Sequence, residues 1–148
     1  MVVRAILAIA VLGLTVAGVA AQQDPIAARK ALMKGNDSNA GILFRMVRGR
    51  EPFDAAKVDA AYAQFVDTAQ KLPALFPDNA KPRRPLGDYS ASLRVWQNRS
   101  DFNAKIADFA KTVAEGRDKV KTLDGLKTAF GPLGQACDNC HELYRVKN

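Results

Sequence analysis

The chain has 148 residues, which is enough for one compact domain and too few for two. Its formal net charge is +7, but the basic residues are spread along the chain without an Arg-rich aromatic recognition pattern. Nucleic acid is therefore a poor candidate as partner, whereas a mildly basic surface suits an acidic protein partner.

The first 21 residues are typical of a cleaved signal peptide. Arg4 supplies a positive charge, residues 5–19 form an apolar run, and small residues at 19–21 precede an expected cleavage site before Gln22. The apolar run is short and rich in alanine, so an uncleaved membrane anchor is the weaker alternative. We expect a mature domain of residues 22–148 that folds outside the cytoplasm and is not inserted stably in a membrane.

The mature sequence begins with a long predicted helix. Asp24 can cap its first turn, and Pro25 suits the first helical position. The helix is expected to continue to about Arg48, where Gly49 can end it. The pair at residues 35–36 and the stretch 39–41 contain glycine and asparagine, which weaken the helix locally.

A second helix is predicted from about residues 52–54 to Leu72, and Pro73 and Pro77 close it. Apolar side chains recur along it at steps of three and four residues, which is the spacing of one buried helical face. These side chains are Val58, Tyr62, Phe65, Val66 and Ala69. The following segment, about 78–90, is the longest predicted loop.

Two further helices complete the pattern. The third is expected to begin between residues 93 and 100 and to end at Gly116, and the last to open near Thr122. The pair at residues 131–132, Gly-Pro, is expected to kink the last helix. Four amphipathic helices joined mostly by short loops predict an all-α fold, an antiparallel up-down-up-down four-helix bundle.

The chemistry is concentrated in residues 137–141, which read C-x-x-C-H, the attachment signature of c-type haem. On a helix, Cys137 and Cys140 share one face, so both thiols can reach the two vinyl groups of a porphyrin. His141 follows directly and can bind the iron. The motif therefore predicts one covalent haem c per chain.

Three other roles for the cysteine pair are less favoured. A thioredoxin-like pair needs a strand–helix setting, and no strand is predicted. A zinc site needs about four ligands, whereas the chain has two cysteines and one histidine. A disulfide between these cysteines in a helical structural module would close too small a loop to stabilise much.

The sixth iron ligand, if there is one, can be sought by elimination. His141 is the only histidine, and Met1 leaves with the signal peptide, so Met33 and Met46 are the candidates. In the predicted bundle the end of the last helix lies level with the start of the first, which favours Met33. Met46 lies about 20 Å further along the helix. Core packing is the alternative role for Met33.

Further short motifs occur in a characteristic order along the mature chain. They are Arg29 with Met33, residues 52–54, residues 72–77, Val95 with Trp96, Asp101 with Phe102, and residues 137–145. In this order they resemble the class II cytochromes c, the cytochrome c-prime family, and most closely its low-spin branch with histidine and methionine ligands.

The resemblance implies a periplasmic bundle with haem c near one end. Cys137 and Cys140 would be the thioether anchors, His141 the proximal ligand and Met33 the distal ligand. Arg145, and with it Arg29, would place positive charge beside the haem. The alternative for Arg145 is a solvated charge that favours the helix dipole.

Two haem functions follow from these expectations. The first is electron transfer between redox partner proteins, without substrate turnover and hence without enzyme activity. The second is binding of nitric oxide or carbon monoxide to five-coordinate iron, with Met33 as a steric gate. The sequence shows no clear dimer stripe, so both a monomer and a homodimer remain open.

Overall fold

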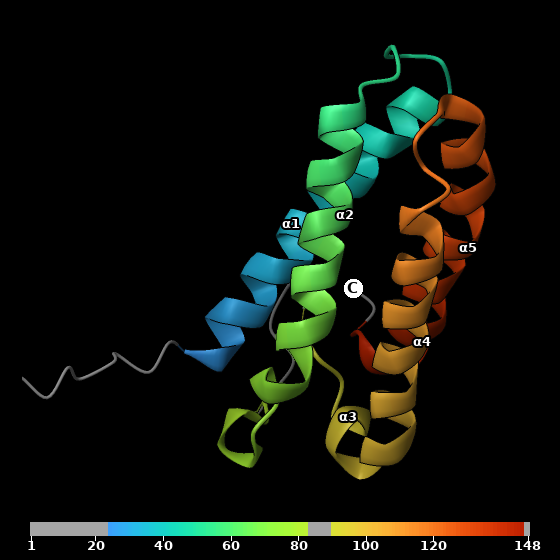
Figure 1. Cartoon of the computed structure of the whole chain (residues 1–148). Helices are drawn as coiled ribbons and strands as arrows, with labels where there is room; N and C mark the ends of the chain where they lie inside the picture. Colours follow the sequence, from blue (N-terminus) through green and yellow to red (C-terminus); the bar gives the residue numbers. More distant parts are fainter. Residues whose placement is uncertain (1–23, 83–89, 147–148) are drawn as a thin grey trace, which may run out of the picture.

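The structure of the chain is a computed structural model that describes residues 24–82 and 90–146 (Figure 1). The predicted signal peptide and its cleavage site before Gln22 lie outside the described residues, and so do residues 83–89 of the predicted loop. Among the described residues, no helix is both long enough and apolar enough to cross a membrane.

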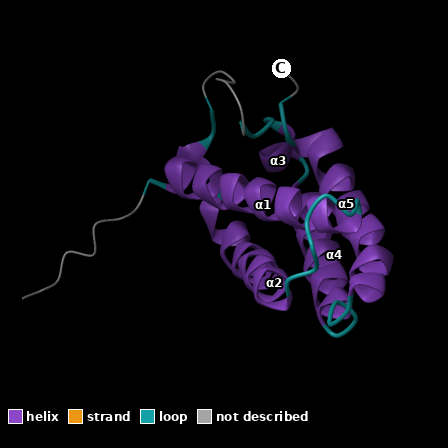
Figure 2. Cartoon of the chain, turned by 90° about the horizontal axis from the view of Figure 1, so that it is seen from above, coloured by secondary structure: helices purple, strands orange, loops and turns teal. Residues whose placement is uncertain are grey.

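Four long helices form the predicted antiparallel bundle and alternate in direction along the chain (Figure 1). They are α1 (Pro25–Val47), α2 (Ala55–Lys71), α4 (Arg99–Arg117) and α5 (Leu123–Tyr144). Seen from above, the described part is helical apart from its connecting loops (Figure 2). The all-α fold class is thus confirmed.

Local signals explain where these helices begin and end. The Asp24 carboxylate accepts the Ile26 backbone N–H at 2.9 Å at the start of α1, and Thr122 accepts from Gly125 at 3.2 Å at the start of α5. Gly49 adopts a φ of +68°, the left-handed conformation that ends a helix with little strain. The chain can therefore turn from α1 toward α2 at the predicted position.

The corner between α2 and α4 is more structured than a simple loop. It contains two 3₁₀ turns, η1 (Leu72–Leu75) and η2 (Asp78–Ala80), and the short helix α3 (Arg94–Gln97). The Trp96 indole donates to the Pro77 carbonyl at 3.2 Å. Arg99 donates to the Phe76 carbonyl at 2.7 Å, so side chains of both helices fix the preceding turns.

The core consists of two clusters of buried side chains. The larger lies between the long helices and includes Leu43, Met46, Tyr62, Phe65 and Leu126. The smaller lies at the end where α5 finishes. It contains Leu72, Phe76, Ala91, Val95, Phe102, Ile106 and Tyr144. Residues from both clusters border a cavity between the long helices.

Candidate haem-binding site

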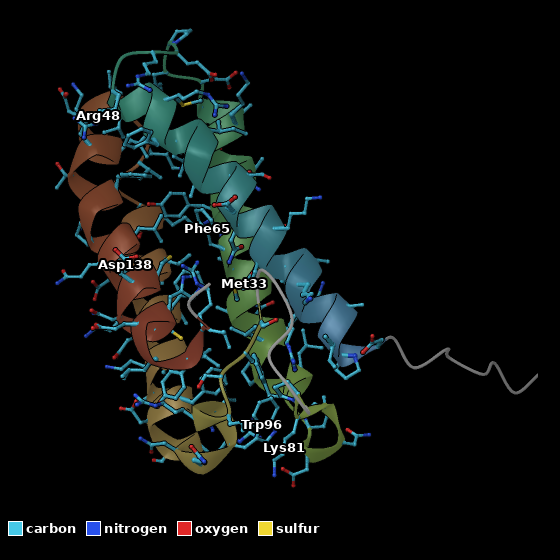
Figure 3. The ribbon with its side chains drawn as sticks, turned by 180° about the vertical axis from the view of Figure 1, so that it is seen from behind. Met33, Arg48, Phe65, Lys81, Trp96 and Asp138 are labelled. Carbon is cyan, nitrogen blue, oxygen red and sulfur yellow. The ribbon has the colours of Figure 1, made fainter. Side chains whose placement is uncertain are left out.

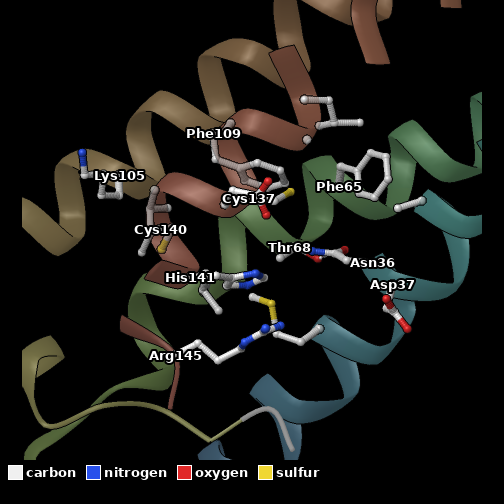
Figure 4. Close-up of a pocket in the computed structure, with 18 of the residues that line it drawn as sticks. Asn36, Asp37, Phe65, Thr68, Lys105, Phe109, Cys137, Cys140, His141 and Arg145 are labelled. Atoms are coloured by element: carbon white, nitrogen blue, oxygen red, sulfur yellow. Dashed lines mark hydrogen bonds between the residues drawn. The ribbon is translucent and has the colours of Figure 1, made fainter. Parts of the chain in front are cut away.

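The C-x-x-C-H motif lies in the last turns of α5 and borders a cavity of about 300 Å³. Figure 4 shows Cys137, Cys140 and His141 on this helix, with His141 projecting into the space between α5 and α1. Both cysteines are half-buried free thiols. The three motif residues that carry the predicted chemistry are therefore brought together at one cavity.

The rest of the cavity lining is mainly apolar and comes from all four long helices. Met33 and Ala40 lie on α1, Phe65 on α2 and Phe109 on α4. Leu72, Ile106, Phe130 and Leu133 complete the apolar wall. The cavity is within the range of about 300–1,000 Å³ that small-molecule and cofactor sites occupy, and its apolar wall suits a porphyrin.

The two candidate methionines have different positions. Met33 is half-buried and lines the cavity together with His141. It lies partway along α1, at a height similar to that of Asp138 on α5 (Figure 3). Met46 is completely buried in the larger core cluster and is not among the described residues that line the cavity. The choice of Met33 over Met46 is consistent with this geometry, although ligation itself stays a prediction.

A second, smaller cavity of about 60 Å³ lies beside the first and brings the two predicted cations toward His141. Met33, Cys140 and His141 border both cavities, Arg145 also borders both, and Arg29 borders the smaller one. Arg145 is exposed, whereas Arg29 is only 4% exposed. The structure thus places both arginines near the motif, and their roles toward haem remain predictions.

Arg29 is held firmly in this position. Its guanidinium donates to the Leu75 carbonyl at 3.2 Å and to the Ala80 carbonyl at 3.4 Å, and it lies over the Phe76 ring at 4.9 Å. Its Nε atom is buried and has no hydrogen-bond partner. A buried N–H without an acceptor is costly, so this atom is suited to an acceptor brought in by a ligand.

Burial also sets the protonation of the motif. Desolvation raises the pKa of Cys137 to about 11, and the Asp138 charge adds to this shift. Desolvation and the neighbouring Cys137 raise the pKa of Cys140 to about 11. For His141, burial lowers the pKa, with a smaller contribution from Arg145. Two neutral thiols and a neutral imidazole therefore face the cavity near pH 7.

These shifts weigh against the alternative roles of the cysteine pair. A thioredoxin-like cysteine needs a lowered thiol pKa, which is the opposite direction. Within residues 24–82 and 90–146 there is no strand, and no group of three or more His, Cys, Asp or Glu side chains could hold a metal ion. Haem attachment is the role that the surroundings of the motif fit.

The end of α5 is anchored close to the motif. The Tyr144 hydroxyl donates to the Asp101 carboxylate at 2.5 Å, and its ring packs edge-on against Phe102. The Ser92 backbone N–H donates to the Tyr144 carbonyl at 2.8 Å, and Val146 donates to Ser90 at 2.9 Å. These contacts fix the helix that carries His141 against α4 and the segment before α3.

Sequence reasoning identified some of the cavity wall and missed other parts. Phe65, which the apolar pattern places on the buried face of the second helix, lines the cavity. Sequence reasoning missed Asn36 and Thr68, which are polar and lie across from His141 (Figure 4). The available signal was Thr68 itself, because it shares the buried face of α2 three residues after Phe65.

A helical bundle whose final helix carries C-x-x-C-H at an apolar cavity, with the chain's one histidine facing that cavity, defines a mono-haem c-type cytochrome. The family profile described as cytochrome c' matches residues 24–145. The chain belongs to the cytochrome c' family, whose members bind covalent haem c.

Individual relatives agree with this assignment. The chain is 44% identical over 145 residues to cytochrome c-556 of Rhodopseudomonas palustris, with 97% of each protein covered. The structure of oxidised cytochrome c556 from R. palustris matches with a TM-score of 0.76 and 45% identity, over 86% of this chain and 99% of that one. A nitric oxide complex of a mutant cytochrome c' from Alcaligenes xylosoxidans matches with a TM-score of 0.73 and 26% identity, over 84% of this chain and 95% of that one.

Proposed function

We propose that this cytochrome is a periplasmic electron carrier whose iron is six-coordinate and low-spin, with His141 and Met33 as axial ligands. The observation that carries the proposal is that Met33 of the first helix and His141 of the last line the same cavity, beside both cysteines. Residues 1–21 would serve as the signal peptide that directs export.

Each residue of the motif has a distinct task in this proposal. Cys137 and Cys140 would form thioether bonds with haem c, which supplies one-electron exchange between ferric and ferrous iron. His141 offers a neutral imidazole because burial disfavours its charged form. The contacts of Tyr144 fix the end of α5 just after His141. They would limit movement of this ligand when the iron changes between its ferric and ferrous states.

Met33 would occupy the remaining axial position. A thioether is a soft, neutral ligand, and methionine ligation raises the reduction potential relative to two histidines. With both axial positions filled, no position is left for a gas, which favours electron transfer as the function. The relative named cytochrome c-556 supports this proposal by its similarity over nearly the whole chain.

Arg29 and Arg145 would place positive charge beside the acidic groups of the haem. Arg29 has better support for this role than Arg145, because its buried Nε has no hydrogen-bond partner and a propionate oxygen could accept its hydrogen bond. Arg145 is exposed and would act mainly through its charge. Its positive charge already lowers the pKa of His141.

The second candidate is a gas-binding cytochrome with five-coordinate iron. It is supported by the similar cytochrome c' whose structure is described as a nitric oxide complex. In that case Met33 would stay in the cavity wall and limit access to the iron. The same residues would hold the haem in both candidates, so iron coordination separates them.

Visible spectra of the matured protein test the proposal. We expect a sharp low-spin spectrum of the reduced protein that does not change when carbon monoxide is added. A broad high-spin spectrum that shifts with carbon monoxide would support the gas-binding candidate instead. A colourless protein from a host with working haem-attachment machinery would contradict both.

Two matched variants test the ligand itself. Met33→Leu keeps the side-chain volume but removes the thioether, so we expect high-spin iron that binds carbon monoxide. Met46→Leu makes the same change in the larger core cluster and is expected to keep the low-spin spectrum. An unchanged spectrum in Met33→Leu would show that Met33 is not the ligand.

A further inference from the structure

The first two helices approach each other closely just after Met33. Gly35 of α1 faces Gln64 of α2, and a methyl group at Gly35 would lie 3.0 Å from the Gln64 amide nitrogen. A glycine inside a helix costs about 1 kcal/mol relative to alanine, so its presence here has a packing reason. The glycine leaves room for the end of the Gln64 side chain, which a larger residue at position 35 would displace.

A small hydrogen-bond network crosses this contact. The Thr68 hydroxyl donates to the Asn36 side-chain oxygen at 2.8 Å. The Gln64 amide donates to the Thr68 oxygen at 3.2 Å and to the Asn36 oxygen at 3.5 Å. Asn36, three residues after Met33, therefore joins α1 to α2 through a side chain that shares the Met33 face of the helix.

The network is partly buried, with Thr68 at its buried end and with Asn36 and Gln64 half-buried. Thr68 has no exposed surface and is one of the buried polar residues of the domain. Asn36 and Thr68 both line the main cavity, whose wall is mostly apolar. A buried hydroxyl is costly unless it is hydrogen-bonded, so the position of Asn36 is closely coupled to that of Thr68.

We infer that Asn36, Gln64 and Thr68 are positioning residues that hold α1 against α2 and thereby fix Met33 opposite His141. This inference rests on the proposed ligation by Met33. The sequence predicts that Gly35 and Asn36 weaken α1 locally. In the structure, Gly35 leaves room for the Gln64 side chain, and Asn36 supplies the oxygen that accepts the Thr68 hydrogen bond. Without the network, α1 is expected to move more freely and Met33 to leave the iron more often.

The test measures carbon monoxide binding to the reduced holoprotein, because the gas competes with Met33 for the iron. Thr68→Val removes the hydroxyl with little change in shape. We expect the apparent affinity for carbon monoxide to rise by up to about tenfold, since the loss of one hydrogen bond shifts equilibria by roughly this factor. Thr68→Ser keeps the hydroxyl and is expected to remain within about twofold of the wild type.

Thr128→Val is the matched control. Thr128 is exposed on α5, and its hydroxyl donates to the Asp124 carbonyl of the same helix at 3.0 Å. Its carbon monoxide affinity should equal that of the wild type. If Thr68→Val does not fold, Gln64→Leu removes the other donor of the network, and a higher affinity for carbon monoxide in that variant supports the inference.

The outcomes separate this inference from the proposed function. Wild-type protein that is high-spin and binds carbon monoxide readily would overturn Met33 ligation, and the inference with it. Low-spin wild-type protein, together with a Thr68→Val variant of lower thermal stability but unchanged carbon monoxide affinity, would overturn the inference alone. The network would then serve packing only.

Discussion

Tyr144 stands one turn beyond His141 and connects α5 to α4 through a single buried hydroxyl. The hydroxyl donates to the Asp101 carboxylate at 2.5 Å. Burial, together with the hydrogen bond and the charge of Asp101, raises the pKa of Tyr144 from 10.0 to about 12. The neutral phenol is therefore favoured in the folded protein more than in the unfolded chain.

This shift predicts a loss of stability at high pH. The contribution of Tyr144 to the free energy of unfolding is complete below about pH 10 and is lost as the pH rises toward about 12. Tyr144→Phe should lower the free energy of unfolding at neutral pH by about 2 kcal/mol, because the bond to a charged acceptor is lost. Denaturant unfolding at several pH values measures both effects. Equal slopes for wild type and variant between pH 10 and pH 12 would contradict the assignment.

At the scale of single residues, prediction from sequence depended on residue type. The cysteines and His141 carry a spacing that few other chemistries require, so their roles toward haem could be predicted directly from the motif. Met33 could be separated from Met46 because helix geometry places only one of them level with His141. The buried face of α2 pointed to Thr68, but its role could not be predicted, because that role depends on a hydrogen bond to a residue of another helix, 32 residues away along the chain.

At the scale of helices, α2 and α4 are in close contact at Gly116. A methyl group at this position would lie 2.8 Å from the Tyr62 hydroxyl oxygen and 3.0 Å from its ring. Tyr62 is only 1% exposed, so its ring has little room to move. The last turn of α4 therefore requires a residue without a side chain.

Gly116→Ala is expected to lower the free energy of unfolding by about 1–3 kcal/mol, the usual cost of overpacking a core. Gly41→Ala is the matched control inside α1, where the nearest atom to an added methyl group is the Arg45 guanidinium nitrogen at 3.6 Å. The control should gain about 0.5–1 kcal/mol from its better helix propensity. Urea unfolding of both variants measures the difference, and similar values for the two would contradict the packing argument.

Helix ends were predictable where a residue caps its own helix, as at Asp24, Gly49 and Thr122. The corner before α4 was less predictable. Its turns are fixed by Arg29, Trp96 and Arg99, whose side chains donate to carbonyls that lie 19 to 51 residues away in the sequence. Local pattern does not encode such contacts, so only the approximate limits of the third helix could be stated.

At the scale of the whole molecule, all four long helices contribute to the wall of the cavity of about 300 Å³. Because that wall is mostly apolar, a porphyrin seated there would bury apolar surface from every long helix. The haem is therefore expected to be part of the core, and the chain without it to be poorly packed.

The variant Cys137→Ala/Cys140→Ala tests this expectation, because it lacks both thioether anchors. We expect an intact mass without haem, much of the helical far-UV signal, and loss of the near-UV signal of fixed aromatic side chains. Wild-type holoprotein from the same host is the reference. A haem-free variant with wild-type near-UV signal and unfolding midpoint would show that the bundle packs without its cofactor.

The two proposed axial ligands come from the first and the last long helix of the chain, so the visible spectrum of the haem would depend on the folding of the whole domain. In the proposed coordination, Met33 and His141 would meet at the iron only when almost the entire domain is assembled, because nearly all of its sequence lies between them. Loss of a helix contact far from the haem would then release the Met33 sulfur first, because His141 lies next to the two cysteines that would hold the haem. The visible absorption spectrum of the haem would therefore report how completely the chain has folded.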